Sequence, residues 1–290
     1  MIPYYPQPRW EVGPLTIHAF GVLVAIGILL GTHLADRRSV KMGLDPNTTA
    51  RMVLWVVVGG FIGAHLVESL FYSPQQTWKD PIRLLKIWQG ISSFGGFLGA
   101  IVGALWFIKR EKMGVERWHY LDAITWAFPF AWFFGRCGCS VAHDHKGIPS
   151  DFFLAVRFPP SMGGTRLDLG IIEALLTLLW IATAIWLGRK PRAPGFISGV
   201  LAAAYAPIRF GLDFLRTDDR RYLGLTPGQY AAVGLFVLGL WIVYHSRSLA
   251  EYTLVPGGGE VKSKGSDGGG GGGKGRRKKG KAGGGGRRSS

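Results

Sequence analysis

Cysteine is scarce in this sequence of 290 residues, which contains two, Cys137 and Cys139. A structural zinc site usually combines a Cys-x2–4-Cys pair with a second pair of ligands. Here one residue separates the two cysteines, and no second cysteine pair exists. A disulfide between them would close a very small, strained ring. Two free thiols are therefore favoured, and a free thiol most often packs as a small apolar group.

The amino terminus lacks the basic segment and the small-residue cleavage site of a secretory signal peptide. We therefore expect the first apolar segment to remain in the mature protein. Apolar residues, in contrast, are abundant: 48% of the chain is hydrophobic, and it contains eleven tryptophans. They come in blocks of about 20 residues, the length that a helix needs to cross a bilayer.

These apolar blocks are residues 16–34, 52–71, 91–108, 120–138, 170–187, 196–214 and 229–245. Pro129 within the fourth is tolerable where neighbouring helices satisfy the freed carbonyl group. The pattern predicts an all-α integral membrane protein with about seven transmembrane helices. Residues 1–248 form its polytopic membrane domain.

Residues 249–290 are predicted to be a disordered, glycine-rich polybasic tail. From Ser246 onward there are eleven Lys or Arg and three acids. The resulting excess of eight positive charges is half of the formal net charge of +16. Such a tail is attracted to anionic lipid. Nucleic-acid binding has no aromatic or motif support, so no nucleic-acid partner is expected.

Basic residues also gather after alternate apolar blocks. They are Arg37, Arg38, Lys41 and Arg51 after the first block, Lys109, Arg110, Lys112 and Arg117 after the third, and Arg189, Lys190 and Arg192 after the fifth. Cytoplasmic loops carry an excess of Lys and Arg. We therefore expect these segments and the tail to be cytoplasmic, which places the amino terminus outside.

Nearly every ionisable residue within or beside the blocks then falls at one depth, near the outer helix ends. The set is His18, His65, Glu68, Arg136, Glu173, Arg209, Asp213 and Arg216, with Ser92, Ser93, Gly95 and Gly96 beside it. Charges inside a membrane are costly and usually face a cavity or a partner. A salt-bridge ladder between helices is one interpretation. However, Arg209, Asp213 and Arg216 share one helix face, and the surplus positive charge suits a lipid phosphate.

The segment Phe133–Gly147, FFGRCGCSVAHDHKG, concentrates polar chemistry at the end of an apolar run. Three interpretations compete: a metal cluster, a polar helix end, and a site for an anionic substrate at the membrane edge. The cysteine spacing disfavours the first. Gly135 and Gly138 flank Arg136, and such glycines let a ligand approach the backbone closely. Close helix packing explains them as well.

Gly59–Ala64 and Gly95–Ala100 are near copies of each other, GGFIGA and GGFLGA. Their small-xxx-small spacing is typical of membrane helices in contact. The pattern assigns Gly59, Gly63, Gly99 and Gly103 to helix packing. Gly95 and Gly96 lie at the charged depth, where packing and substrate binding are equally good interpretations.

Four regions, taken in order, resemble the bacterial prolipoprotein diacylglyceryl transferase family. They are Gly13–His18, Trp88–Gly99, Gly135–Gly147 at the position of the Gly-Arg-x-Gly-Asn signature, and Arg209–Arg216 with Leu225–Gln229 at the Arg…Glu-Phe-x-Arg…Gly-Gln ending. The resemblance extends from about Gly13 to His245. The order and spacing of these regions carry it.

Other positions depart from the family pattern and imply a divergent member. Phe94 replaces a histidine, Phe20 replaces a tyrosine, Cys139 and Ala142 replace asparagines, and Asp144 replaces a glutamate, whereas Glu173 is kept. The lost polar groups are of the kind that orients an acceptor or relays a proton.

The resemblance implies transfer of the diacylglyceryl group of phosphatidylglycerol to the lipobox cysteine of prolipoproteins, forming a thioether and releasing glycerol phosphate. A leaving phosphate needs positive charge, and a thiol of pKa about 8.5 needs a base or a positive field. Arg136 and Arg209 are the predicted phosphate clamp, and the base is Asp144, His143 or Glu173. The predicted catalytic residues are Arg136, Arg209, Asp144 and Glu173; the predicted substrate-binding residues are Gly95, Gly96, Gly135, Gly138, His18, His143, Asp213 and Arg216.

The partners implied are phosphatidylglycerol, prolipoprotein signal peptides and the lipid bilayer, in the bacterial cytoplasmic (inner) membrane, with no cofactor and no metal. Two alternatives remain. One is a family paralogue that modifies another acceptor or none, and the other is a lipid-binding or transport protein without this chemistry. A transporter predicts discontinuous helices at matching positions of two halves, which the two glycine motifs in adjacent spans do not supply.

Overall fold

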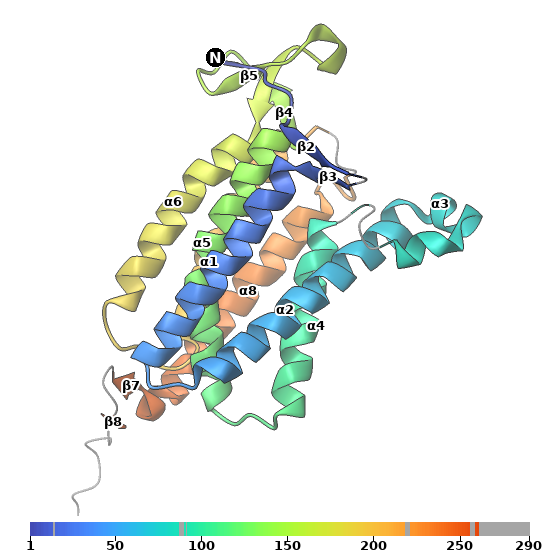
Figure 1. The fold of residues 1–290 in the computed structure, drawn as a ribbon. Coiled ribbons are helices and arrows are strands. Elements are labelled where there is room, and N and C mark those ends of the chain that lie inside the picture. Colours follow the sequence, from blue (N-terminus) through green and yellow to red (C-terminus); the bar gives the residue numbers. More distant parts are fainter. Residues whose placement is uncertain (14, 87–89, 91, 218–220, 256–258, 261–290) are drawn as a thin grey trace, which may run out of the picture.

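The computed structural model describes residues 1–13, 15–86, 90, 92–217, 221–255 and 259–260, and most of these are helical (Figure 1). The long helices in these ranges are α1 (Ala19–Lys41), α2 (Pro46–Val67), α4 (Ser93–Arg110), α5 (Glu116–Ala142), α6 (Leu169–Gly188), α7 (Phe196–Leu212) and α8 (Pro227–Ser248). Each coincides with one predicted apolar block, so the blocks are helical as predicted. Of the predicted tail, residues 256–258 and 261–290 lie outside the described ranges.

Four helices in the described ranges are long and apolar enough to cross a membrane: α1, α2 with the π-helical turn η1 (Glu68–Tyr72), α6 and α8. The other helices are shorter or more polar, since α7 has 17 residues and α5 includes Asp122 and Arg136. Many large apolar side chains face outward, such as Leu29 at 71% exposure and Leu179 at 63%. This surface suits lipid rather than water, and the chain is a membrane protein.

A small sheet covers one end of the helices (Figure 1). Its order is β1 (Ile2–Pro3), β5 (Ala155–Arg157), β6 (Thr165–Asp168) and β4 (Lys146–Pro149); β1 pairs with β5 in parallel, and the other pairs are antiparallel. The hairpin of β2 (Arg9–Val12) and β3 (Leu15–His18) leads directly into α1. The all-α prediction omitted these strands because each has only two to four residues, and because β1 pairs with the distant β5.

Polar caps fix where several helices begin. Asp45 accepts hydrogen bonds from the backbone of α2, whose first residue is Pro46. Ser92 and Asp168 cap α4 and α6 in the same manner. Thr226 forms a reciprocal capping box with Gln229 at the start of α8. Because each cap satisfies N–H groups that lack a partner within the helix, these residues set the depth at which the helices begin.

Glycine brings α2 and α4 into backbone contact. A Cβ atom on Gly59 would lie 2.5 Å from the carbonyl oxygen of Gly99, and one on Gly99 would collide with the Gly59 backbone. Gly63 meets Gly95 and Gly99 in the same way, and Gly103 lies against the Trp55 backbone. The prediction that these glycines serve helix packing is confirmed.

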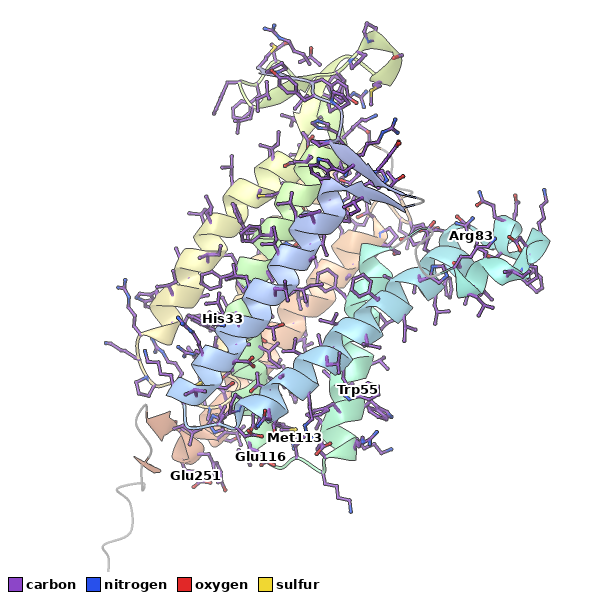
Figure 2. The ribbon with its side chains drawn as sticks, in the orientation of Figure 1. His33, Trp55, Arg83, Met113, Glu116 and Glu251 are labelled. Atoms are coloured by element: carbon purple, nitrogen blue, oxygen red, sulfur yellow. The ribbon has the colours of Figure 1, made fainter. Side chains whose placement is uncertain are left out.

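The end of the molecule opposite the sheet has its own apolar core. Met52, Phe107, Met113 and Tyr120 are buried together there, and Met113 is labelled at this end in Figure 2. Trp55, also labelled, packs against Trp106 with ring centroids 4.0 Å apart and the ring planes tilted by 45°. This core joins α2 and α4 to the start of α5, so the connection between α4 and α5 is held in place.

Beyond α2 the chain projects away from the bundle through η1, α3 (Pro74–Lys79) and the 3-10 helix η2 (Pro81–Leu85), where Figure 2 labels Arg83. Trp78 and Leu85 are 85% and 76% exposed. His65 holds the projection to α2, because its Nε2 lies 3.1 Å from the carbonyl oxygen of Arg83. An exposed apolar segment beside charged residues suits the interface between membrane and water.

Candidate active site

A buried carboxylate joins three helices near the sheet-covered end. Nη1 of Arg136, in the last turns of α5, donates a hydrogen bond to Oε2 of Glu173 on α6 over 3.1 Å. Oε1 of Glu173 accepts a second bond, of 2.6 Å, from the Tyr205 hydroxyl on α7. The Arg136 and Glu173 side chains are 7% and 2% exposed. Glu173 therefore fixes the position of the guanidinium group.

The Nε–H donor of the Arg136 guanidinium is not used by these contacts. Trp132, one turn earlier on α5, covers one face of the group, with Cζ of Arg136 4.1 Å from the ring centroid. Nε of Arg136 is buried and has no hydrogen-bond partner among the described residues. A planar cation with a free N–H is suited to an anionic oxygen.

A second arginine approaches from α7. Nη2 of Arg209 lies 2.8 Å from Oδ1 of Asp213, as the i, i+4 spacing predicts. Asp213 begins the 3-10 helix η4 (Asp213–Leu215) and is fully buried, and its Oδ2 accepts a 2.6 Å hydrogen bond from Thr226. Gly228 lies against this pair, since a Cβ there would collide with Oδ2 of Asp213. The start of α8 thereby holds Asp213 and its arginine.

Arg136, Arg209 and Arg216 line one cavity of about 440 Å³. Its walls also include the apolar residues Phe97, Leu98, Ile101, Phe128, Trp132, Trp180, Leu235 and Leu238. Glu173 lines it, together with His145 and Tyr205. Arg136 is paired with Glu173, and Arg209 is paired with Asp213 behind it. The cavity combines three guanidinium groups with long apolar walls, which fits an anionic headgroup attached to acyl chains.

His143 lies in the sheet cap rather than in the cavity lining. It follows the last residue of α5 in the left-handed conformation, with φ 53°. Its Nδ1 lies 2.6 Å from Oδ2 of Asp168, and its Nε2 lies 3.1 Å from the carbonyl oxygen of Tyr5. Burial raises the pKa of the Asp168 carboxyl, and the hydrogen bond with His143 opposes this. Both ring nitrogens of His143 are therefore engaged at the end of α5.

Two predicted substrate-binding glycines fit closely against neighbouring helices. A Cβ atom on Gly95 would lie 2.6 Å from Cβ of Val67 on α2, and one on Gly138 would lie 3.0 Å from Cδ2 of Phe20 on α1. Both glycines are buried. Their close contacts account for the absence of a side chain, independently of any substrate contact.

Four other predicted residues have more open surroundings. Gly135 has no neighbour within 4 Å of a Cβ position, and for Gly96 the nearest such neighbour is Cβ of Ala64 at 3.7 Å. His18 is exposed at the start of α1, and Asp144 is exposed after α5. None of these four is among the residues that line the cavity described above. Their roles in binding or proton transfer stay predictions.

Several site residues were missed because they lie within apolar runs. Trp132 and Tyr205 read as span residues, yet they contact Arg136 and Glu173. Thr226 lies outside the apolar blocks; it caps α8 and donates a hydrogen bond to Asp213. One signal could have identified Tyr205: it carries a hydroxyl group within an apolar block, near the level at which the charged residues lie.

Replacing Tyr205 with phenylalanine is expected to lower the activity of the site about tenfold while leaving the protein folded. The change removes one hydrogen bond to a buried carboxylate, which contributes about 1.5–3 kcal/mol, and thereby loosens the position of Arg136. Initial rates in the assay described below test this. Tyr230→Phe is the matched control, because that hydroxyl bonds to the exposed backbone of Tyr222. Equal rates for the two variants would contradict the prediction.

Comparison with known proteins identifies the family of this chain. The model of the family described as prolipoprotein diacylglyceryl transferase matches residues 8–245. The chain belongs to this family. The match extends from the β2–β3 hairpin to near the end of α8, and so includes every element that lines the cavity.

Curated relatives cover most of the chain. A protein of Rhizobium leguminosarum bv. trifolii is 31% identical over 266 residues, which are 84% of this chain and 93% of the relative. One of Solidesulfovibrio magneticus is 33% identical over 254 residues, covering 83% and 94%. One of Pseudomonas fluorescens is 32% identical over 275 residues, covering 86% and 98%. All three are named phosphatidylglycerol–prolipoprotein diacylglyceryl transferase.

Proposed function

We propose that this protein transfers the diacylglyceryl group of phosphatidylglycerol to the lipobox cysteine thiol of prolipoproteins, forming a thioether and releasing glycerol phosphate. The observation that supports it most directly is the shared cavity, which Arg136 on α5 and Arg209 on α7 line together with apolar residues. Membership of the transferase family, and the names of relatives across most of the chain, support the same reaction.

In this proposal the arginines bind the phosphate and the walls receive the acyl chains. Arg136 offers its unused Nε and is held by Glu173, while Arg209 is held by Asp213. The phosphate ester leaves when the thiolate attacks the glycerol carbon, and negative charge grows on its oxygen. Guanidinium groups fixed in advance at low dielectric stabilise this charge without reorganising.

The proton of the attacking thiol needs an acceptor, and three predicted residues differ in their freedom to serve. Glu173 is engaged with Arg136 and Tyr205, and His143 is engaged at both ring nitrogens. Asp144 is exposed, and its Oδ1 lies 2.8 Å from Nδ1 of His145, which lines the cavity. This arrangement favours Asp144 over the other two.

We infer seven transmembrane helices in the cytoplasmic (inner) membrane, with the amino terminus outside. Figure 1 supports this, because the amino terminus lies beside the sheet at one end, whereas β7 (Leu254–Val255) and β8 (Gly259–Glu260) lie at the opposite end. Lys41, Arg110 and Arg189 follow or end helices that run away from the sheet. The basic end is therefore cytoplasmic under the positive-inside bias, and the cavity arginines lie near the outer face.

The test is mass spectrometry of a lipobox peptide incubated with the purified full-length protein and phosphatidylglycerol. We expect a diacylglyceryl adduct on the peptide cysteine and one released glycerol phosphate per adduct. Phosphatidylcholine and a peptide with serine in place of the cysteine are the controls. An unmodified peptide, despite saturable binding of phosphatidylglycerol, would favour a lipid-binding protein, and a different adduct would favour a paralogue with another acceptor.

A further inference from the structure

His145 is not among the bases predicted from the sequence, yet it reaches the arginine cavity. Its side chain lines the cavity together with Arg136 and Glu173 and is 16% exposed. No other histidine is among the described residues that line this cavity. Histidine is the side chain whose protonation changes most readily near neutral pH. An imidazole in this wall is therefore able to exchange a proton with a bound molecule.

The neighbouring Asp144 holds one nitrogen of this ring. Its Oδ1 lies 2.8 Å from Nδ1 of His145, and Nδ1 is buried. The two groups are out of line for a hydrogen bond, but the exposed Asp144 carboxylate has room to rotate, and catalytic hydrogen bonds often tighten when substrate binds. An ionised carboxylate only accepts, so it places the ring proton on Nδ1. Nε2, at the far end of the ring, is then an acceptor.

The backbone on both sides of His145 is held where α5 meets α6. His143 ends α5 in the left-handed conformation, and its ring is bonded to Asp168. The carbonyl oxygen of His145 accepts a 2.9 Å hydrogen bond from the backbone N–H of Leu169. On the following side, Lys146 begins β4 and pairs with Asp168 of β6. The imidazole is thus positioned before any substrate binds, which a catalytic group requires.

Charged groups from several elements surround the pair formed by His145 and Asp144. They are Arg136 and the Cys139 thiol of α5, Glu173 of α6, Asp168 of β6, Arg209 of α7 and Arg216. His145 interacts electrostatically with Glu173, and Asp144 does so with Arg136. The pair therefore lies beside the phosphate clamp, and an imidazolium formed there is stabilised by two carboxylates.

The three bases predicted from the sequence do not have this access. Glu173 is engaged with Arg136 and Tyr205, and His143 is engaged in the sheet cap. Asp144 is the freest of the three, but it is not among the residues that line the cavity. Its contact with His145 connects it to the cavity.

We propose that His145 is the general base that takes the proton of the acceptor thiol at Nε2, and that Asp144 is a positioning residue that holds Nδ1. The inference rests on the proposed transferase function and identifies the base for it. Asp144 then acts on the thiol through His145 rather than directly. A carboxylate that orients a histidine in this manner also stabilises the imidazolium that forms.

The step balances without a further reactant. The thiol proton moves to Nε2 of His145, and the sulfur electron pair forms the bond to the glycerol carbon. The bond from that carbon to the phosphate oxygen breaks, and the oxygen keeps the bonding pair and departs as glycerol phosphate. Its charge is stabilised by the arginines. The imidazolium finally releases its proton to solvent, which restores the base.

The His145→Gln variant tests the base, because glutamine keeps a polar end of similar reach but accepts no proton at neutral pH. A positioned general base contributes about a hundredfold to ten-thousandfold, so transfer by the purified full-length variant at neutral pH should fall by at least about a hundredfold. Binding of phosphatidylglycerol should be unchanged. His33→Gln is the matched control, because His33 is an exposed histidine of α1 far from the cavity (Figure 2), and it should keep its rate.

The pH profile distinguishes a base from a merely structural residue. Without His145 the thiol has to ionise unaided, so the rate of His145→Gln should keep rising up to the ordinary thiol pKa of about 8.5. The deficit relative to the unchanged protein should therefore shrink as the pH rises. Asp144→Asn should lower kcat about tenfold with little change in KM for the peptide, because a positioning residue acts on the proton transfer and not on binding.

Chemical rescue gives a second, independent readout. In His145→Ala, added imidazole can occupy the space of the missing ring and accept the thiol proton, so transfer should increase about tenfold or more. This variant decides the question if His145→Gln loses phosphatidylglycerol binding and is therefore misfolded. No increase with imidazole then overturns the role of His145.

The outcomes separate this inference from the function on which it rests. Equal rates for His145→Gln and His33→Gln, or a His145→Gln profile parallel to that of the unchanged protein, overturn His145 as the base. Transfer by the unchanged protein in the same experiment keeps the transferase proposal. No transfer by the unchanged protein overturns both, since no thiol is then activated.

Discussion

The Arg136→Ala variant is expected to lose at least a hundredfold of its diacylglyceryl transfer rate. Arg136 is buried in the cavity, fixed by Glu173 and stacked on Trp132, and keeps its Nε free. Removing one preorganised group that stabilises transition-state charge typically costs about a hundredfold to a thousandfold in rate. Initial rates with phosphatidylglycerol and a lipobox peptide measure this. Arg157→Ala, on the exposed residue of β5, is the control and should keep its rate.

A stability effect must be separated from this loss. Removing Arg136 leaves the Glu173 carboxylate buried without its cation, and breaking a buried ion pair costs about 3–5 kcal/mol. The double variant Arg136→Ala with Glu173→Gln removes both charges and keeps an acceptor for Tyr205, so it should be the more stable protein. Transfer by the double variant above a tenth of the unchanged rate would contradict the phosphate-binding role of Arg136.

The Gly99→Val variant is expected to prevent α2 and α4 from assembling. A Cβ atom on Gly99 would overlap the Gly59 backbone and lie 2.9 Å from Cα of Gly63, so the helices would have to separate. Overpacking a tight contact typically costs about 1–3 kcal/mol even where side chains can move, and here backbone opposes backbone. The fraction recovered as a monodisperse detergent-solubilised protein, and its thermal unfolding temperature, should both fall sharply.

Gly21 on α1 provides the matched control for this variant. It also lies within an apolar helix, but no atom lies within 4 Å of its Cβ position. Gly21→Val should therefore yield as much folded protein as the unchanged chain. Equal yields for Gly99→Val and Gly21→Val would show that the contact between α2 and α4 is not needed for folding.

The sequence predicts those features that depend on local pattern and on charge in an apolar setting. Apolar blocks located each long helix, because spans need length and hydrophobicity within one segment. Arg136, Glu173 and Arg209 stood out because a charged side chain within an apolar segment is costly unless it faces a cavity or a partner. All three line the cavity. The GGFIGA and GGFLGA copies likewise predicted the contact of α2 with α4.

What the sequence did not predict depends on contacts between distant segments. The sheet joins β1 to β5 across more than half of the chain. Strands of two to four residues are too short to show a periodicity from which such a pairing could be predicted. Tyr205 is indistinguishable from a lipid-facing tyrosine until α6 and α7 are placed side by side. His145 stands in a polar segment of the sequence, but its proximity to Cys139 depends on the backbone turn at His143 and could not be predicted.

The packing of α4 has a consequence for how diacyl lipids and diacylated products enter and leave the cavity. Phe97, Leu98 and Ile101 of α4 line the cavity, yet α4 packs chiefly against α2 rather than against the other cavity helices. That wall therefore belongs to a two-helix unit that stands beside the remaining bundle (Figure 1). Sideways passage along it would let a lipidated polypeptide return to the bilayer with its hydrocarbon tails shielded from water throughout.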